Sequence, residues 1–243
     1  MKVHHSTKVT IVALALMTVC QVGVASRHET SAEFLKRHGI ELTENSLVAA
    51  LRNPDPEIRD NAAQEIANEK AVAASPAIKD ALATEKDPER QVNFAYTLAQ
   101  LGDKGGFVAL KHFCDTASPS PGLKAASYML RFGDESCLGA VQSVLRKEPQ
   151  SDFDHFHMAV AMSLIPSFHK LTDSDKSELI ALTVKRLGDS NSYTRMIASQ
   201  VLAKIGDSSA IPPLEKAVAD ETDKVVRDSM EAELEKLQAR GSH

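Results

Sequence analysis

Apolar side chains recur at helical spacing in short segments, and the segments themselves return about every 32 residues along the chain. Each begins with a Pro- or Asp-containing turn and an Arg, and continues as an Ala-rich amphipathic stretch. The turn appears at Asn53–Arg59, Lys86–Arg90, Asn191–Arg195 and Asp223–Arg227. A period of this length is typical of stacked helix pairs, in which no single pair can bury its apolar face alone. No segment shows the two-residue alternation of a strand. The pattern therefore predicts an all-α fold, an α-solenoid.

About six helix pairs are expected, within residues 42–239. Pro54 ends the first helix because the residue before a proline is disfavoured in the α region, and Pro56 opens the second, where its missing N–H costs nothing. Gly102 ends a later helix in a left-handed turn. The expected pairs are 43–52 with 56–69, 76–84 with 88–101, 106–116 with 121–132, 135–146 with 153–165, 174–187 with 192–205, and 211–219 with 222–237.

The two ends of the chain are expected to differ from the repeats. Residues 26–41 are expected to form a short lead-in or capping helix, and residues 240–243 a tail. Residues 1–25 combine Lys2 and Lys8 with an apolar run from Val9 to Val19 and small residues before a cleavage site near Ala25 or Ser26. This is the pattern of a signal peptide, and the run is shorter than the roughly 20 residues that span a bilayer. A periplasmic or secreted protein is expected, with no transmembrane segment after signal removal.

The charge balance narrows the class of partner. The chain has 28 basic and 33 acidic side chains, and loss of residues 1–25 removes two lysines and no acid, which leaves a net charge of −7. Nucleic acid requires a basic surface, so the sequence predicts no nucleic-acid binding. A protein or peptide is the expected partner.

Two cysteines, Cys114 and Cys137, remain after the predicted leader. In an oxidising compartment they are candidates for a disulfide. The alternative is two buried thiols, because free Cys packs like a small apolar side chain.

The turns and the closures Leu101–Asp103 and Ile205–Asp207 resemble HEAT repeats, in particular the short bacterial kind that is also found in phycobilin lyases. The resemblance covers about residues 42–237. It implies that a turn Asp and a helix Arg form a ladder from repeat to repeat. Two pairs of residues match that ladder, Asp55 with Arg59 and Asp223 with Arg227. The third and fourth units lack it.

The densest polar cluster is the segment 151–157, where Asp154 and His157 lie one helical turn apart and are within reach of one metal ion. A further ligand would have to come from His112 or His169. The structural interpretation is favoured, in which an Asp caps the helix, Phe153 and Phe156 pack inward and the histidines lie at the surface. No metal, cofactor or catalytic residue is predicted.

The concave side of the stack is the favoured working surface, because it collects side chains from every second helix. The helix arginines could instead form a cationic stripe for an acidic partner, but pairing with turn acids is favoured. The sequence thus predicts a non-catalytic exported scaffold; the alternatives are a cofactor or chromophore lyase or its chaperone, or a metal-dependent enzyme. The exposed concave positions are expected to include Asn61, Glu65, Asn93, Tyr96, Gln100, Tyr128, Arg131, His157, Tyr193 and Gln200.

Overall fold

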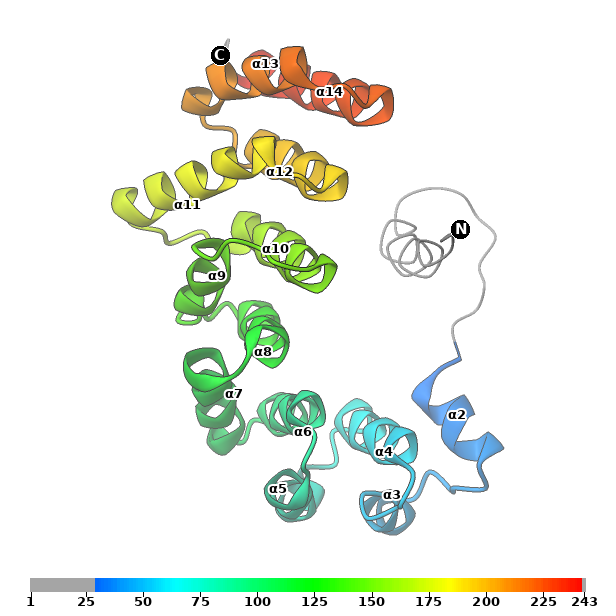
Figure 1. The fold of residues 1–243 in the computed structure, drawn as a ribbon. Coiled ribbons are helices and arrows are strands. Elements are labelled where there is room, and N and C mark those ends of the chain that lie inside the picture. Colours follow the sequence, from blue (N-terminus) through cyan, green and yellow to red (C-terminus); the bar gives the residue numbers. More distant parts are fainter. Residues whose placement is uncertain (1–28, 242–243) are drawn as a thin grey trace, which may run out of the picture.

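The computed structural model describes residues 29–241 (Figure 1). Within this range it contains thirteen α-helices, four short 3₁₀ turns and no strand, so the prediction of an all-α solenoid is confirmed. The predicted signal peptide, residues 1–25, lies outside the described residues, and so do Ser242 and His243.

All six expected helix pairs are present. They follow α2 (Ser31–Arg37), which lies in the expected lead-in segment. The pairs are α3 (Glu44–Ala50) with α4 (Pro56–Asn68), α5 (Ser75–Thr84) with α6 (Pro88–Gln100), α7 (Lys104–Thr116) with α8 (Pro119–Arg131), α9 (Leu138–Leu145) with α10 (Asp152–Leu164), α11 (Asp173–Lys185) with α12 (Ser192–Ile205), and α13 (Ile211–Asp220) with α14 (Lys224–Gly241).

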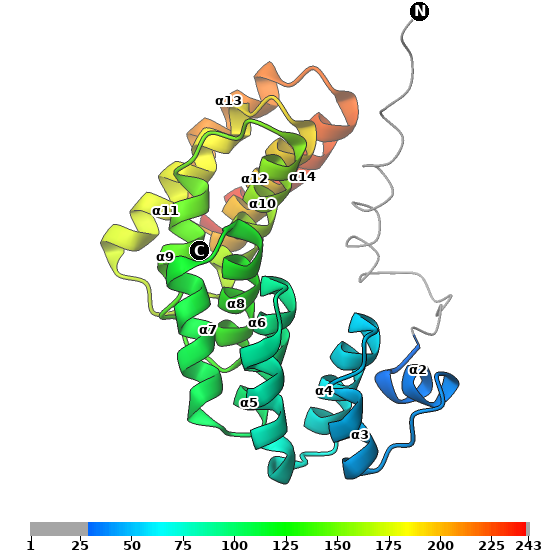
Figure 2. The same cartoon turned by 60° about the horizontal axis from the view of Figure 1, so that its bottom comes forward.

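The pairs stack into a curved rod. The second helices α4, α6, α8, α10, α12 and α14 form the inner row and the first helices form the outer row (Figure 1). Neighbouring inner helices contact one another along the whole stack, and α2 packs on α4, where it extends the inner row at the N-terminal end (Figure 2). The concave side is therefore built from the second helices.

The repeated turn forms because its residues satisfy the first backbone N–H groups of the helix that follows. Asp55 accepts from the N–H of Glu57 at 2.8 Å, and Asp87 accepts from that of Glu89 at 2.9 Å. Pro56 occupies the first position of α4, where no backbone donor is needed. The Asp-Pro-Glu order is thus a helix start.

Small residues allow the helices to approach closely. Ala95 and Ala99 on α6 are buried, and Gly106 on α7 lies directly against them. A Cβ atom on Gly106 would lie 2.4 Å from the backbone nitrogen of Ala99 and 2.6 Å from the carbonyl oxygen of Ala95. The contact between α6 and α7 therefore requires glycine at this position.

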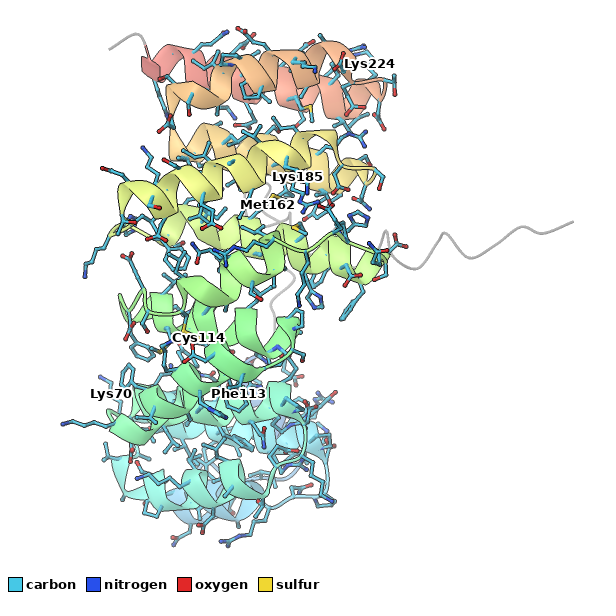
Figure 3. All side chains as sticks on the ribbon, turned by 60° about the vertical axis from the view of Figure 1, so that its left-hand side comes forward. Lys70, Phe113, Cys114, Met162, Lys185 and Lys224 are labelled. Atoms are coloured by element: carbon cyan, nitrogen blue, oxygen red, sulfur yellow. A yellow bond between two sulfur atoms is a disulfide. The ribbon has the colours of Figure 1, made fainter. Side chains whose placement is uncertain are left out.

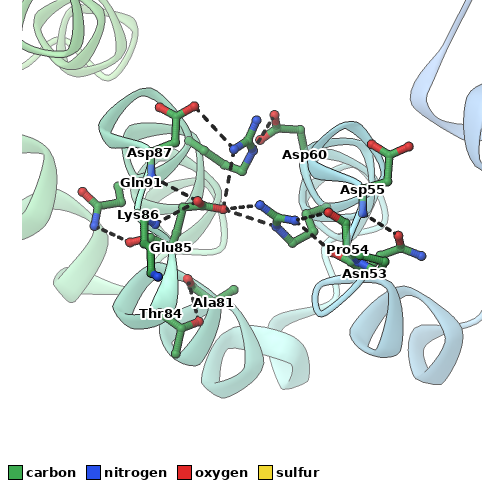
Figure 4. Close-up of polar contacts among 12 residues, drawn as sticks. Asn53, Pro54, Asp55, Asp60, Ala81, Thr84, Glu85, Lys86, Asp87 and Gln91 are labelled. Atoms are coloured by element: carbon green, nitrogen blue, oxygen red, sulfur yellow. Dashed lines mark hydrogen bonds and ion pairs between the residues drawn. The ribbon is translucent and has the colours of Figure 1, made fainter.

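The arginine ladder is built from a different acid than expected. Arg59 does not bind Asp55, which is occupied in capping α4; its Nη2 and Nε lie 2.8 and 3.2 Å from Glu85 Oε2, and its Nη1 donates to the carbonyl oxygens of Asn53 and Pro54 (Figure 4). Glu85 ends α5, so the pair joins the first repeat to the second.

The same geometry returns near the C-terminus. Arg195 binds Glu221 with Nε and Nη2 at 2.6 and 2.9 Å, and its Nη1 donates to the carbonyl oxygens of Asp189 and Ser190. Asp223 caps α14 through the N–H of Val225, and within residues 29–241 Arg227 has no ion pair.

The fourth turn, which has no arginine of its own, receives one from the next repeat. Arg186 is buried at the end of α11 and donates to the carbonyl oxygens of Leu145 and Lys147 and to the carboxylate of Glu148. A guanidinium therefore binds the backbone carbonyls of this turn too, but it comes from the helix pair that follows the turn.

A disulfide joins the third and fourth pairs. Cys114 on α7 and Cys137, the residue before α9, are bonded, and their Cα atoms lie 5.5 Å apart. Both residues are buried, and Cys114 is marked on its helix in Figure 3. The bridge closes the segment that contains α8.

The C-terminal helix is longer than expected, since α14 continues to Gly241 and includes the predicted tail residue Arg240. The guanidinium of Arg240 donates to the carbonyl oxygens of Ala203 and Lys204 at 2.7 and 3.3 Å. These contacts with the end of α12 hold the last turn of α14 in place.

Candidate binding surface on the concave side

Two tyrosines from neighbouring inner helices stack on the concave side. Tyr96 on α6 and Tyr128 on α8 have ring centroids 3.9 Å apart and planes inclined by 11°. They are separated by 32 residues, one repeat period, so each occupies nearly the same position on its helix. Stacked rings of this kind are large, stiff and partly apolar, and such side chains often carry binding energy.

A guanidinium lies over this pair. Arg131, one turn further along α8, places its Cζ 5.4 Å from the ring centroid of Tyr128 and 5.8 Å from that of Tyr96. These distances are those of cation–π contacts. Its Nη1 also lies 3.4 Å from the hydroxyl of Tyr96. The arginine is exposed to solvent but is held in place by the two rings.

Polar side chains connect this stack to α4. Tyr128 donates from its hydroxyl to Asn93 Oδ1 at 3.2 Å, and Asn93 Nδ2 donates to Asp60 Oδ1 at 3.1 Å. The other oxygen of Asp60 accepts from Arg90 Nε at 3.0 Å. The row Asp60, Asn93 and Tyr128 thus crosses three consecutive inner helices, and each member fixes the next.

A small hollow lies beside this row, with a volume of about 200 Å³. It is lined from α4, α6 and α8 by Asp60, Asn61, Gln64, Asn93, Tyr96, Thr97 and Tyr128. Burial raises the pKa of Tyr128, and the nearby cation Arg131 opposes this only in part, so the phenol stays protonated and donates its hydrogen bond at neutral pH. The hollow therefore presents amides, tyrosine side chains and the carboxylate of Asp60.

The structure brings together four of the concave positions expected from the sequence, namely Asn93, Tyr96, Tyr128 and Arg131. Asn61 lines the same hollow, whereas Glu65 is buried. Gln100 is exposed at the end of α6, and Tyr193 and Gln200 lie on α12, outside the lining of this hollow. Asp60 was missed, although its separation of 33 residues from Asn93 is the signal that could have found it.

The segment 151–157 is arranged in the opposite way to the expectation. Phe153 and Phe156 are exposed to 63% and 36%, whereas His157 is buried at 5%. The reason is the helical period: the buried stripe of α10 contains Met158, Ala161 and Met162, and the two phenylalanines lie on the opposite face.

The structure also shows where the two candidate metal ligands of this segment, Asp154 and His157, lie. Asp154 accepts from the hydroxyl of Ser151 at 2.8 Å and from the N–H of Gln150, as part of the start of α10. His157 packs edge-on against the ring of Phe153, and burial lowers the pKa of His157, so its ring is neutral. Within residues 29–241 no group of three or more His, Cys, Asp or Glu side chains is placed to hold a metal ion.

The fold and this surface define the class: a solenoid of helix pairs that presents side chains from successive units on its inner face. A family model described as HEAT repeats matches residues 158–235, which include the second half of α10, all of α11, α12 and α13, and most of α14. This part of the chain therefore consists of HEAT repeats. Within residues 29–241, no helix is both long enough and apolar enough to span a bilayer.

Solved structures with a similar course of the chain include two engineered proteins. The first is 20% identical with a TM-score of 0.45, over 80% of this chain and 96% of that chain. The second is 19% identical with a TM-score of 0.46, over 86% of this chain and 60% of that chain. Human deoxyhypusine hydroxylase in complex with glycerol is 15% identical with a TM-score of 0.28, over 80% of this chain and 84% of that chain. The comparison with curated proteins found no match.

Proposed function

We propose that this protein is a non-catalytic scaffold that binds a protein or peptide through the concave side of its repeats. The observation that carries the proposal is the stack of Tyr96 and Tyr128 under the guanidinium of Arg131. Tyrosine and arginine, with tryptophan, are enriched among the residues that carry most of the binding energy at the centres of protein interfaces. Here they are half-buried or exposed, are fixed by one another, and lie beside the amides of Asn61, Gln64 and Asn93.

The double variant Tyr96→Ala/Tyr128→Ala is expected to lose its partner. Each truncation at such a centre costs about 2 kcal/mol, so the pair should weaken binding at least about 30-fold. The measurement is quantitative capture from a cell extract followed by mass spectrometry, and then the Kd of the recovered protein by calorimetry. The matched control is Val108→Ala/Lys111→Ala, which removes one exposed and one partly exposed side chain from the outer helix α7.

Because loss of the two rings could also disturb α6 and α8, the exposed Arg131→Ala variant is measured beside it, with thermal unfolding of all three proteins. A captured protein that binds all three as tightly as it binds the wild type would show that the concave surface is not the binding site.

We also propose that the protein is exported and works in the periplasm or outside the cell. The leader-like pattern of residues 1–25 supports this, and so does the bond between Cys114 and Cys137, because disulfides persist in oxidising compartments.

Protein purified from its native cells is therefore expected to begin at Ser26 or Arg27 and to show no thiol reactive toward an alkylating reagent before reduction. Replacement of both cysteines by serine is expected to lower the free energy of unfolding by about 3 kcal/mol, mainly because the unfolded chain gains freedom. N-terminal sequencing, mass spectrometry after alkylation and chemical denaturation check these points. A chain that starts at Met1 and carries free thiols would contradict the export proposal.

A further inference from the structure

Within residues 29–241, Arg131 differs from most arginines because it has no carboxylate within 4 Å. Within residues 29–241 only Arg227 and Arg240, both on α14, share this property, and Arg240 is occupied by two backbone carbonyls. The arginines that do have a carboxylate within 4 Å are Arg37, Arg52, Arg59, Arg90, Arg146, Arg186 and Arg195.

The guanidinium of Arg131 is nevertheless held in a fixed position. The rings of Tyr96 and Tyr128 lie under it, and one of its donors is used by the Tyr96 hydroxyl at the long distance of 3.4 Å. A guanidinium has five N–H donors in a planar fork that matches a carboxylate, and a fork already fixed loses little entropy when it binds one.

The other charges of this part of the surface are compensated. Asp60 is paired with Arg90 at 3.0 Å, and Glu89 is paired with Lys124 at 3.2 Å. Beside the hollow, among residues 29–241, Arg131 is therefore left without a counter-charge, and its charge is positive. A pair of tyrosine faces alone would also suit a cationic ligand, but here a cation already lies over them.

We infer that the concave surface binds an extended peptide segment that places an aspartate or glutamate side chain against Arg131, with neighbouring residues over the tyrosines and the hollow. The inference rests on the proposed function and specifies its partner. Three adjacent inner helices extend over about 20 Å, since packed helices lie 8–10 Å apart, and about six or seven extended residues cover that length.

The test uses random heptapeptides, amidated at the C-terminus, selected on the wild-type protein and on Arg131→Gln in parallel. Peptides retained by the wild type are expected to be enriched several-fold in Asp and Glu at one position, and this enrichment should be absent with Arg131→Gln. For one selected peptide measured by calorimetry, a change of its acid to the amide and the change Arg131→Gln should each weaken binding about tenfold. Combined, they should weaken it little more than either alone, because they remove the same contact.

Arg131→Lys keeps the charge but not the fork or the stacking, and it should fall between the wild type and Arg131→Gln. Selected peptides that bind through Tyr96 and Tyr128 yet carry no common acid, or whose affinity ignores Arg131, would overturn this inference and leave the proposed function intact. Failure to select any peptide that depends on the tyrosines would overturn both.

Discussion

Glu85→Gln is expected to lower the free energy of unfolding by about 3 kcal/mol at neutral pH, a shift of roughly 6–12 °C in Tm for a domain of this size. The side chain of Glu85 is 7% exposed, and it accepts from Arg59 and from the backbone N–H groups of Lys86 and Asp87 (Figure 4). The amide has one acceptor oxygen and an NH₂ group in place of the second. One Glu85 oxygen accepts from both backbone N–H groups and the other accepts from Arg59. An amide that keeps its oxygen at the backbone therefore turns its NH₂ group toward the half-buried guanidinium of Arg59, which loses both its acceptor and its counter-charge.

The stabilisation by the Glu85 carboxylate should also depend on pH. Burial alone would raise the pKa of Glu85, but the hydrogen bonds from Asp87, Arg59 and Lys86 outweigh it and lower the pKa from 4.5 to about 2. A carboxylate with a depressed folded-state pKa stabilises the fold fully above its unfolded pKa. That contribution disappears as the pH falls from about 4.5 to about 2. The stability difference between wild type and Glu85→Gln should shrink over this window.

Urea denaturation of the two proteins between pH 7 and pH 2 measures this difference. Glu41→Gln is the control, since Glu41 is exposed and within residues 29–241 forms no ion pair; its effect should stay within about 0.5 kcal/mol. A difference for Glu85→Gln that is constant with pH would show that its carboxylate charge is not what stabilises the junction.

Gly106→Ala is expected to destabilise the fold by about 3 kcal/mol or more. The new Cβ would lie 2.4 Å from a backbone nitrogen of α6 and 2.6 Å from a backbone oxygen, so no side-chain rotation relieves the overlap and α7 must move away.

The same substitution at Gly139 is the matched control. Gly139 lies in α9 with nothing within 4 Å of its missing Cβ, so alanine there should stabilise the helix by about 0.5–1 kcal/mol. Chemical denaturation measures the free energy of unfolding of both variants. It should be lower than the wild-type value for Gly106→Ala and higher for Gly139→Ala. Equal effects would mean that α6 and α7 do not approach as closely as the structure shows.

The helix pairs could be predicted from the sequence because each helix start and end has a local signal. Pro56 and Pro88 at first helical positions, with Asp55 and Asp87 before them, mark the boundaries without knowledge of tertiary contacts. The start of α9 had no such cap, and it begins at Leu138, three residues later than expected. Local chemistry therefore determined how well each boundary could be located.

Contacts between repeats were harder to predict. The partner of Arg59 is 26 residues away at the end of the next outer helix, and nothing in the turn itself identifies it. On the concave side the positions were predictable one at a time from the helical period, but the stacking of Tyr96 on Tyr128 depends on the rise between units. For α10, the expectation that the phenylalanines pack inward was wrong. Phe153 is more apolar than His157, yet the helical period places Phe153 on the solvent-exposed face of α10.

The arginine junctions also have a consequence for how the rod comes apart. Arg59 and Arg195 each bind a carboxylate of the following helix pair. Arg186 donates hydrogen bonds in the other direction, to the turn of the preceding helix pair. If one helix pair unfolded alone, its neighbour would keep an arginine without its carboxylate, or backbone carbonyl groups without their donor. Local unfolding at these junctions is therefore costly. Adjacent units are thereby tied into shared cooperative blocks, and fraying should begin at the ends of the chain rather than at these seams.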